Sequence, residues 1–127
     1  MTCAQPTLRY GSGMSGYDGE DFYCDVAIPR REPLDVVFED DDVLAYHHTR
    51  PFWPVHVVVV PKRHVDSLLA LDDPDLAQHL LRVVQRTAES VLSEHGAASV
   101  MTNLGAYQDS RHLHVHVRSG VPLARTS

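Results

Sequence analysis

The sequence predicts an α+β domain in which helices pack on one face of a mainly antiparallel sheet of five strands. Three observations carry this prediction: apolar runs flank an acidic turn in residues 36–46, β-branched residues fill positions 55–60, and apolar residues recur at helical spacing in residues 74–95. The chain has 127 residues, which corresponds to one domain because domains commonly contain about 100–150 residues.

The first three strands follow from the apolar runs. Residues 36–38 and 43–46 are separated by Glu39 and three aspartates, which favour a turn, so we expect a hairpin. Residues 55–60 contain five valines, and β-branched side chains on both faces suit a buried strand. Pro61 has no N–H group to donate, so we expect the strand to stop there.

The long helix has the clearest boundaries in the sequence. Asp73 is suited to the N-cap, Pro74 to the first helical position, and Gly96 to the left-handed residue that follows a helix. We therefore predict a helix over residues 74–95, preceded by a shorter helix or turn in residues 65–71. The apolar side of the long helix comprises Leu76, Leu80, Val83, Val84, Ala88, Val91 and Leu92.

Two more strands are expected after this helix, at residues 98–102 and 112–117, joined by the loop 103–110. Before the first strand, glycine-rich residues without an apolar period predict a loose segment. The predicted organisation is a flexible N-terminal arm, one domain and a C-terminal tail, at residues 1–20, 21–120 and 121–127.

Composition excludes two classes of protein. The formal net charge is −6, which argues against a long nucleic acid as partner, because such proteins carry a basic surface. The longest apolar run, residues 57–60, is far shorter than a membrane span of about 20 residues. Cys3 and Cys24 are too few for a disulfide framework, so we expect a reduced, cytoplasmic protein.

The predicted last strand, residues 112–117, alternates three histidines with aliphatic residues. Because alternate side chains of a strand share a face, His112, His114 and His116 are expected on one face and the aliphatic residues in the core. Two chemistries suit three adjacent imidazoles: a metal site, or attack by one neutral imidazole that its neighbours orient. Neutral donors in the preceding loop suit phosphate oxygens and favour the second, which requires the middle imidazole to open into a cleft.

This sequence resembles the histidine-triad (HIT) superfamily. Residues 112–117 match its His-φ-His-φ-His-φ signature, in which φ is an apolar residue. Residues 36–46 resemble the first hairpin of the family, and residues 56–64 resemble its H-x-x-x-x-P-K-x-H segment. The resemblance extends over about residues 22–120.

The resemblance implies a homodimer with a joint ten-stranded sheet, and a site for a nucleoside 5′-phosphoryl group that is hydrolysed or transferred through a nucleotidyl-histidine. His114 would be the nucleophile, flanked by His112 and His116, with His56 as the fourth histidine of the site. The substrate-binding residues it implies are Gln108 and Asn103 near the phosphate, Asp109 and His48 where relatives have a hydroxyl and an acidic residue, and Tyr23, Tyr46 and Val58 at the base.

No cofactor and no metal are predicted. Zinc-carrying relatives have a Cys-x-x-Cys motif where this chain has Asp21 and Cys24, and His64 is interpreted as a polar residue at a helix start. Two alternatives to a hydrolase or nucleotidyl transferase remain open. One is a non-catalytic nucleotide- or metabolite-binding protein on the same scaffold, and the other is a metal-binding protein that uses the three histidines.

Overall fold

The computed structural model describes residues 19 and 21–124, so the predictions for residues 1–18, 20 and 125–127 lie outside the described residues. Its elements are the π-helix η1 (Tyr23–Ala27), β1 (Val36–Glu39), β2 (Val43–His47), β3 (Val55–Pro61), the 3₁₀ helix η2 (Leu68–Ala70), α1 (Pro74–His95), β4 (Ser99–Met101), the 3₁₀ helix η3 (Gly105–Tyr107) and β5 (Val115–Ser119).

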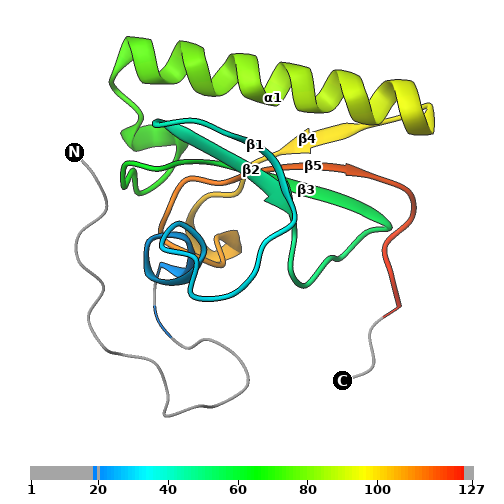
Figure 1. Cartoon of the computed structure of the whole chain (residues 1–127), viewed down its shortest axis with the longest axis horizontal. Helices are drawn as coiled ribbons and strands as arrows, with labels where there is room; N and C mark the ends of the chain where they lie inside the picture. The colour runs from blue at the N-terminus through cyan, green and yellow to red at the C-terminus, as the bar shows by residue number, and fades with distance from the viewer. Residues whose placement is uncertain (1–18, 20, 125–127) are drawn as a thin grey trace.

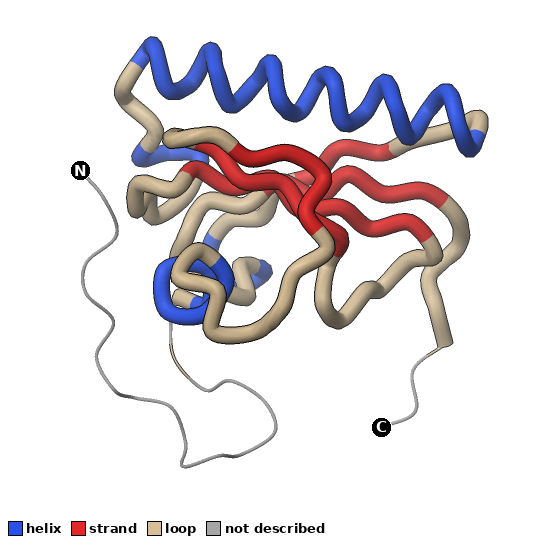
Figure 2. Tube along the Cα trace, viewed as in Figure 1, coloured by secondary structure: helices blue, strands red, loops and turns tan. Residues whose placement is uncertain are grey.

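The five strands form one antiparallel sheet in the order β1-β2-β3-β5-β4, which confirms the predicted α+β architecture. Helix α1 crosses one face of the sheet, while η1 and the loops lie on the opposite side (Figures 1 and 2). The two faces are therefore covered by different kinds of structure, a long regular helix and a set of short irregular segments.

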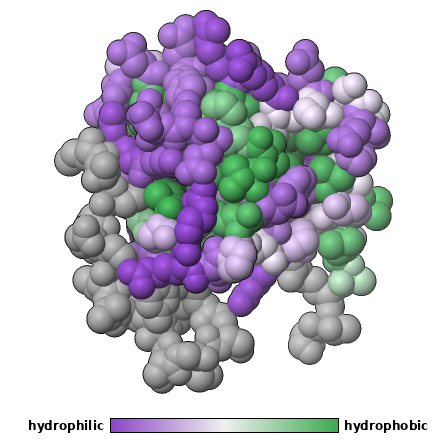
Figure 3. Space-filling view, viewed as in Figure 1, coloured by the Kyte–Doolittle hydropathy of each residue, from purple (hydrophilic) through white to green (hydrophobic). Residues whose placement is uncertain are grey.

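Helix α1 begins and ends where the sequence predicts. The Asp73 side chain accepts hydrogen bonds from the N–H groups of Asp75 and Leu76, and Gly96 adopts a left-handed conformation with φ of 81°. The outer side of the helix is hydrophilic (Figure 3), as expected when its apolar side is buried. That apolar side packs on core residues of the sheet, among them Val57, Val59, Leu113, Val115 and Val117.

The last strand begins later than predicted, at Val115 instead of His112. The ladder between β3 and β5 starts with the pair Val59 and Val115, close to Pro61, which has no N–H group to extend it. The preceding residues bond elsewhere: the Leu113 N–H donates to the Val65 carbonyl oxygen. His112 and His114 therefore come from an irregular segment that leads into the strand, with a bend at His112.

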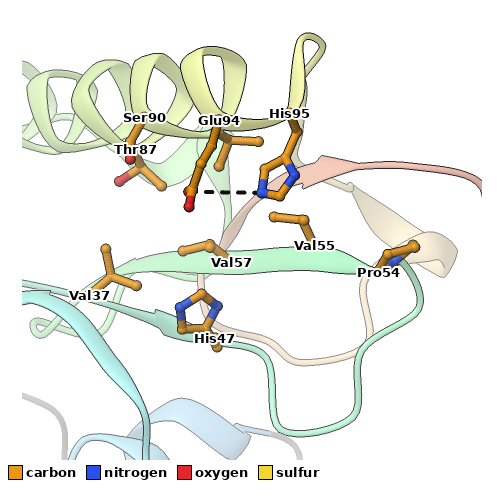
Figure 4. Close-up of a pocket in the computed structure, with 10 residues that line it drawn as sticks. Val37, His47, Pro54, Val55, Val57, Thr87, Ser90, Glu94 and His95 are labelled. Atoms are coloured by element: carbon orange, nitrogen blue, oxygen red, sulfur yellow. Dashed lines mark ion pairs between the residues drawn. The ribbon is translucent and has the colours of Figure 1, made fainter.

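A cavity of about 290 Å³ lies on the helix side of the sheet (Figure 4). None of the predicted site residues lines it, so it is separate from the histidine row. Its lining residues are Val37, His47, Pro54, Val55, Val57, Thr87, Ser90, Val91, Glu94 and His95. In the described part of the chain, no helix combines the length and the apolar character that crossing a bilayer requires.

Candidate active site

The face of the sheet opposite α1 carries the histidine row. Leu113, Val115 and Val117 belong to the core beneath the helix, so the intervening histidines point to the other face. All three histidines of the row and His56 are at most 5 % exposed. The structure thus brings the four predicted catalytic residues together, although their roles stay predictions.

The surroundings of His114 fix which of its nitrogens holds the proton. Its Nδ1 lies 2.7 Å from the His112 carbonyl oxygen. A carbonyl can only accept, so Nδ1 must donate, and in the neutral ring the lone pair is at Nε2. Burial is the main cause that lowers the pKa of His114, with a smaller contribution from the charge of His112. At neutral pH the ring is therefore an uncharged base with its lone pair at Nε2.

A short relay fixes the tautomers of the next two histidines. The Phe52 N–H donates to Nδ1 of His56 at 3.0 Å, and Nε2 of His56 lies 2.8 Å from Nδ1 of His116. In neutral rings, His56 must then donate from Nε2 to His116, which leaves an N–H donor at Nε2 of His116. Burial, followed by the charges of His114 and His48, lowers the pKa of His116 to about 4.

His48 joins this group by stacking. Its ring lies 4.4 Å from that of His56, with the two planes 18° apart, and 6.3 Å from that of His116. The Arg50 N–H donates to Nδ1 of His48 at 2.9 Å, so a neutral His48 also carries its proton on Nε2. His48, which is predicted to stand where relatives have an acidic residue, thus carries a hydrogen-bond donor.

The predicted base-side residues form a second apolar cluster on the histidine face, which includes Tyr23, Tyr46 and Val58. The Tyr23 ring lies 4.9 Å from that of His114 and 5.6 Å from that of His112. Burial raises the pKa of both Tyr23 and Tyr46, so both phenols stay protonated. Tyr23 covers one side of His114, whose exposed fraction is only 2 %.

The three loop residues predicted to contact substrate have different positions. The Gln108 side-chain amide donates to the Asp66 carbonyl oxygen at 2.5 Å, and the Asp66 carboxylate lies 2.6 Å from Nε2 of His64. Asp109 is exposed, and its negative charge works to raise the pKa of both Tyr23 and His114. Asn103 is half-buried, and the structure gives it no specific contact with the histidines.

An acidic cluster that the sequence analysis missed surrounds the other end of the row. Nδ1 of His64 lies 2.5 Å and Nδ1 of His112 lies 3.1 Å from the same carboxylate oxygen of Asp21. The Cys24 sulfur lies 3.4 Å from Nδ1 of His112. His64 is therefore a member of this cluster, not merely a polar residue at a helix start. The only available signal was the spacing of histidines in the H-x-x-x-x-P-K-x-H segment.

The charges in this cluster stabilise one another. Burial opposes ionisation of Asp21, yet the hydrogen bond and charge of His112, with help from the Cys24 N–H and His64, lower its pKa. Burial also works against a charged His64, but hydrogen bonds to Asp66 and Asp21 outweigh it and raise its pKa. The cluster therefore favours a cation next to a carboxylate.

The donor set also fits a metal ion such as the zinc of the relatives with a Cys-x-x-Cys motif. Single ligand atoms of Asp21, Cys24, His64 and His112 all lie within 4.8 Å of one another. Nε2 of His112 lies 2.7 Å from the Pro61 carbonyl oxygen and must donate to it, so Nδ1 of a neutral ring offers a lone pair. Metal-ligating histidines commonly donate their second N–H to a carbonyl or carboxylate.

Two findings limit what this part of the site can bind. The structure has Cys24 in a disulfide bond, which differs from the expected reduced state, and a thiolate ligand would first require reduction. Among the described residues, the groups of three or more close metal-ligating atoms include neither His114 nor His116. Within the residues that the structure describes, the three histidines of the row therefore do not form one such group, so the third hypothesis gains no support from this geometry.

Comparison with known proteins decides the family. The model of the HIT domain family matches residues 30–122, a range that includes the whole histidine row. The chain belongs to the HIT family. An uncharacterised HIT-like protein of Synechococcus elongatus is 35 % identical over 108 residues, which are 83 % of this chain and 95 % of that relative.

Solved HIT structures share the fold. A HIT-like protein involved in cell-cycle regulation from Bartonella henselae matches with a TM-score of 0.71 and 29 % identity, over 83 % of this chain and 82 % of that one. A HIT family hydrolase from Clostridium thermocellum matches with a TM-score of 0.65 and 27 % identity, over 84 % and 95 %. A hypothetical histidine triad nucleotide-binding protein from Sulfolobus tokodaii matches with a TM-score of 0.67 and 29 % identity, over 73 % of this chain and 64 % of that one.

Proposed function

We propose that this HIT protein is a nucleotide hydrolase or nucleotidyl transferase that acts on a nucleoside 5′-phosphoryl group through a covalent nucleotidyl-His114. The observation that carries the proposal is the hydrogen bond of 2.7 Å from Nδ1 of His114 to the His112 carbonyl oxygen. It directs the lone pair to Nε2, and the lowered pKa keeps that lone pair unprotonated at neutral pH. The hydrolase and nucleotide-binding names of the matched structures support the same class of reaction.

The proposed reaction has two displacements. In the first, Nε2 of His114 attacks the α-phosphorus, an N–P bond forms, and the bond from phosphorus to the leaving group breaks with its electron pair on the leaving group, which takes a proton from solvent. In the second, water attacks phosphorus and releases one proton to solvent, the N–P bond breaks with its electron pair on Nε2, and Nε2 regains its lone pair. The N–H at Nε2 of His116 can donate to a phosphoryl oxygen, as such reactions require positioning and charge stabilisation.

Replacement of His114 tests this proposal directly. We expect His114→Ala to lower kcat/KM for adenosine phosphoramidate by at least about 10³-fold, because the nucleophile is lost. Mass spectrometry of the wild type quenched during turnover should show one added nucleotidyl group, and the variant should show none. His95→Ala, at an exposed helix position, is the matched control and should keep full activity. Full activity of the folded His114→Ala variant would refute the assignment.

One observation favours a second candidate function. His114 is 2 % exposed and its ring lies 4.9 Å from that of Tyr23, so covalent chemistry requires a movement that opens Nε2 to substrate. A HIT-scaffold protein that binds a nucleotide or metabolite without reacting would not need that movement at His114. Calorimetry that shows tight binding of AMP or GMP, together with no turnover of phosphoramidate, sulfate or polyphosphate substrates, would support this candidate over the enzyme.

We also propose a homodimer in which two sheets join into ten strands. Strand β4 is an edge of the sheet, and exposed edges readily pair with another chain. Val100 in β4 is 52 % exposed, and Leu92 and Leu104 nearby in the sequence are 52 % and 42 % exposed. Light scattering should give twice the chain mass for the wild type, and Val100→Lys should shift it towards monomer. A wild type that is monomeric at all concentrations contradicts the dimer.

A further inference from the structure

Arg118 extends the histidine row by one position. It follows His116 at the alternate position of β5, so its side chain lies on the histidine face. It is also the register partner of His56 on β3. The alternation therefore continues through the row as three histidines and then an arginine, a residue that the sequence analysis did not assign.

Trp53 holds one side of this arginine. The guanidinium carbon lies 4.5 Å from the centroid of the Trp53 ring, which is within the range of a cation–π interaction. The same ring lies 4.9 Å from that of His56, edge to face at 78°. Arg118 is thus fixed beside the relay of His56 and His116 by an aromatic contact.

This end of the row has more hydrogen-bond donors than acceptors. Nε of Arg118 and Nε1 of Trp53 are the buried side-chain nitrogens without a hydrogen-bond partner in residues 21–124. No carboxylate of the described residues forms an ion pair with Arg118. A permanent cation without a counter-charge therefore lies next to imidazole N–H donors.

Such a group selects an oxyanion. Guanidinium groups are well matched to phosphate oxygens, and hydrogen bonds to charged groups are the stronger ones. Arg118 lies four residues beyond His114, which is roughly 13 Å along an extended strand. A ligand that contacts both residues must extend past His116, so a single phosphoryl group at His114 is too short and a second, attached phosphate is required.

We propose that Arg118, positioned by Trp53, is a specificity-determining residue that selects nucleotides with a second phosphate beyond the phosphoryl group at His114 over nucleotides with a single phosphoryl group. The inference rests on the proposed function, because it identifies a second anion subsite in the same row. It predicts that Arg118 discriminates between ligands with one phosphate and ligands with two or more.

The test measures binding in a His114→Ala background, which prevents turnover. Calorimetry gives the Kd of AMP and of ADP for this parent and for the added substitutions Arg118→Leu and Arg118→Lys. We expect Arg118→Leu to raise the Kd of ADP by roughly 10- to 100-fold, the value of a lost hydrogen bond to a charged group, while the Kd of AMP changes less than about threefold. The Kd of ADP for the Arg118→Lys variant should lie between that of the parent and that of the Arg118→Leu variant. Arg86→Leu, at an exposed helix arginine, is the matched control and should change neither Kd.

A merely structural Arg118 gives a different result. If Arg118→Leu raises the Kd of AMP and the Kd of ADP by the same factor, or if the parent does not bind ADP at all, the inference is overturned. Trp53→Leu should reduce the preference for ADP in the same direction as Arg118→Leu but by a smaller factor, because it removes only the positioning contact. No change in the preference would contradict its positioning role.

Failure of the proposed function can be told apart from failure of this inference. In enzyme with an intact His114, Arg118→Leu should lower kcat/KM for polyphosphate substrates by at least about tenfold more than kcat/KM for adenosine phosphoramidate, because only the polyphosphates present a second phosphate. If no substrate is turned over but the Arg118-dependent preference for ADP persists, the covalent mechanism fails and the subsite stands. If turnover depends on His114 and Arg118→Leu alters all substrates equally, the subsite fails and the mechanism stands.

Discussion

The two ends of the histidine row differ in charge, although the residues that form them alternate along one segment. At one end, Asp21 contacts both His112 and His64, and the pKa of His64 is raised. At the other end, His116 lies among imidazoles near Arg118, and burial lowers its pKa to about 4. One end is therefore built to hold a cation next to a carboxylate, whereas the imidazole of His116 at the other end remains neutral beside the permanently charged Arg118.

This difference assigns separate tasks to residues that look equivalent in the sequence. His112 is fully buried and bonded on both nitrogens, so it anchors the segment. His116 receives a hydrogen bond from His56 and keeps an N–H donor for an anion. His114 lies between them and takes its orientation from the His112 backbone. The anchor, the proposed nucleophile and the proposed anion-binding group thus occupy alternate positions, two of them before β5 and one within it.

The largest expected effect is a difference in stability between the two ends. We expect His112→Ala to lower the free energy of unfolding by about 3–4 kcal/mol, because it leaves a cavity and the Pro61 carbonyl and Asp21 without their partner. His116→Ala should lower it by only about 1–2 kcal/mol, since one hydrogen bond is lost. Urea denaturation of both variants measures the difference, and equal values would remove the distinction between anchor and binding group.

The next effect is the pH dependence that His116 contributes. Its pKa is near 6.5 when unfolded and about 4 when folded, so between these values the unfolded chain binds a proton that the folded chain does not. The contribution of His116 to the free energy of unfolding is fully present above pH 6.5 and is lost as the pH falls towards 4. From pH 7 to 5, the wild type should lose about 2 kcal/mol through this group.

The variant His116→Asn provides the comparison. Asparagine does not titrate, so the variant should lose less of its free energy of unfolding than the wild type over the same pH range. Denaturant titrations at pH 7, 6 and 5 measure both slopes. Parallel slopes for the two proteins would show that His116 is not held neutral by burial.

The sequence predicts the parts of this molecule that depend on local chemistry. Helix α1 follows from the cap at Asp73 and the turn at Gly96, and the two faces of β3 and β5 follow from alternation. The late start of β5 could not be predicted, because it depends on Pro61 of a different strand meeting the end of the ladder. Local periodicity contains no information about where two strands stop pairing.

The same limit applies to the site. The four predicted catalytic histidines do lie together. Three of them alternate along one short segment, and the resemblance to the family motif identifies His56 as the fourth. The contact between Asp21 and His64 joins residues 43 positions apart, and no pattern along the chain indicates it. The proton on His116 depends in turn on a backbone N–H at Phe52. Arg118, by contrast, could have been found by continuing the alternation one step.

The smallest expected effect tests whether the acidic end holds a metal ion as well as a proton. With Cys24 reduced, Zn²⁺ at ten times its Kd should raise the free energy of unfolding by about 1.4 kcal/mol, because binding to the folded state alone stabilises it. Thermal unfolding with and without a chelator measures the shift. Asp21→Ala should abolish the shift, since it removes the carboxylate oxygen that the two imidazoles share.

A matched control comes from the second acidic group of the structure. Asp40, Asp42 and His79 also place three ligand atoms within 4.8 Å of one another, but none of them is buried. Asp40→Ala should therefore leave the zinc-dependent shift unchanged. If Asp40→Ala reduces the shift as much as Asp21→Ala does, zinc acts on surface carboxylates in general, and the contrast between the two ends of the row reduces to a difference in proton affinity.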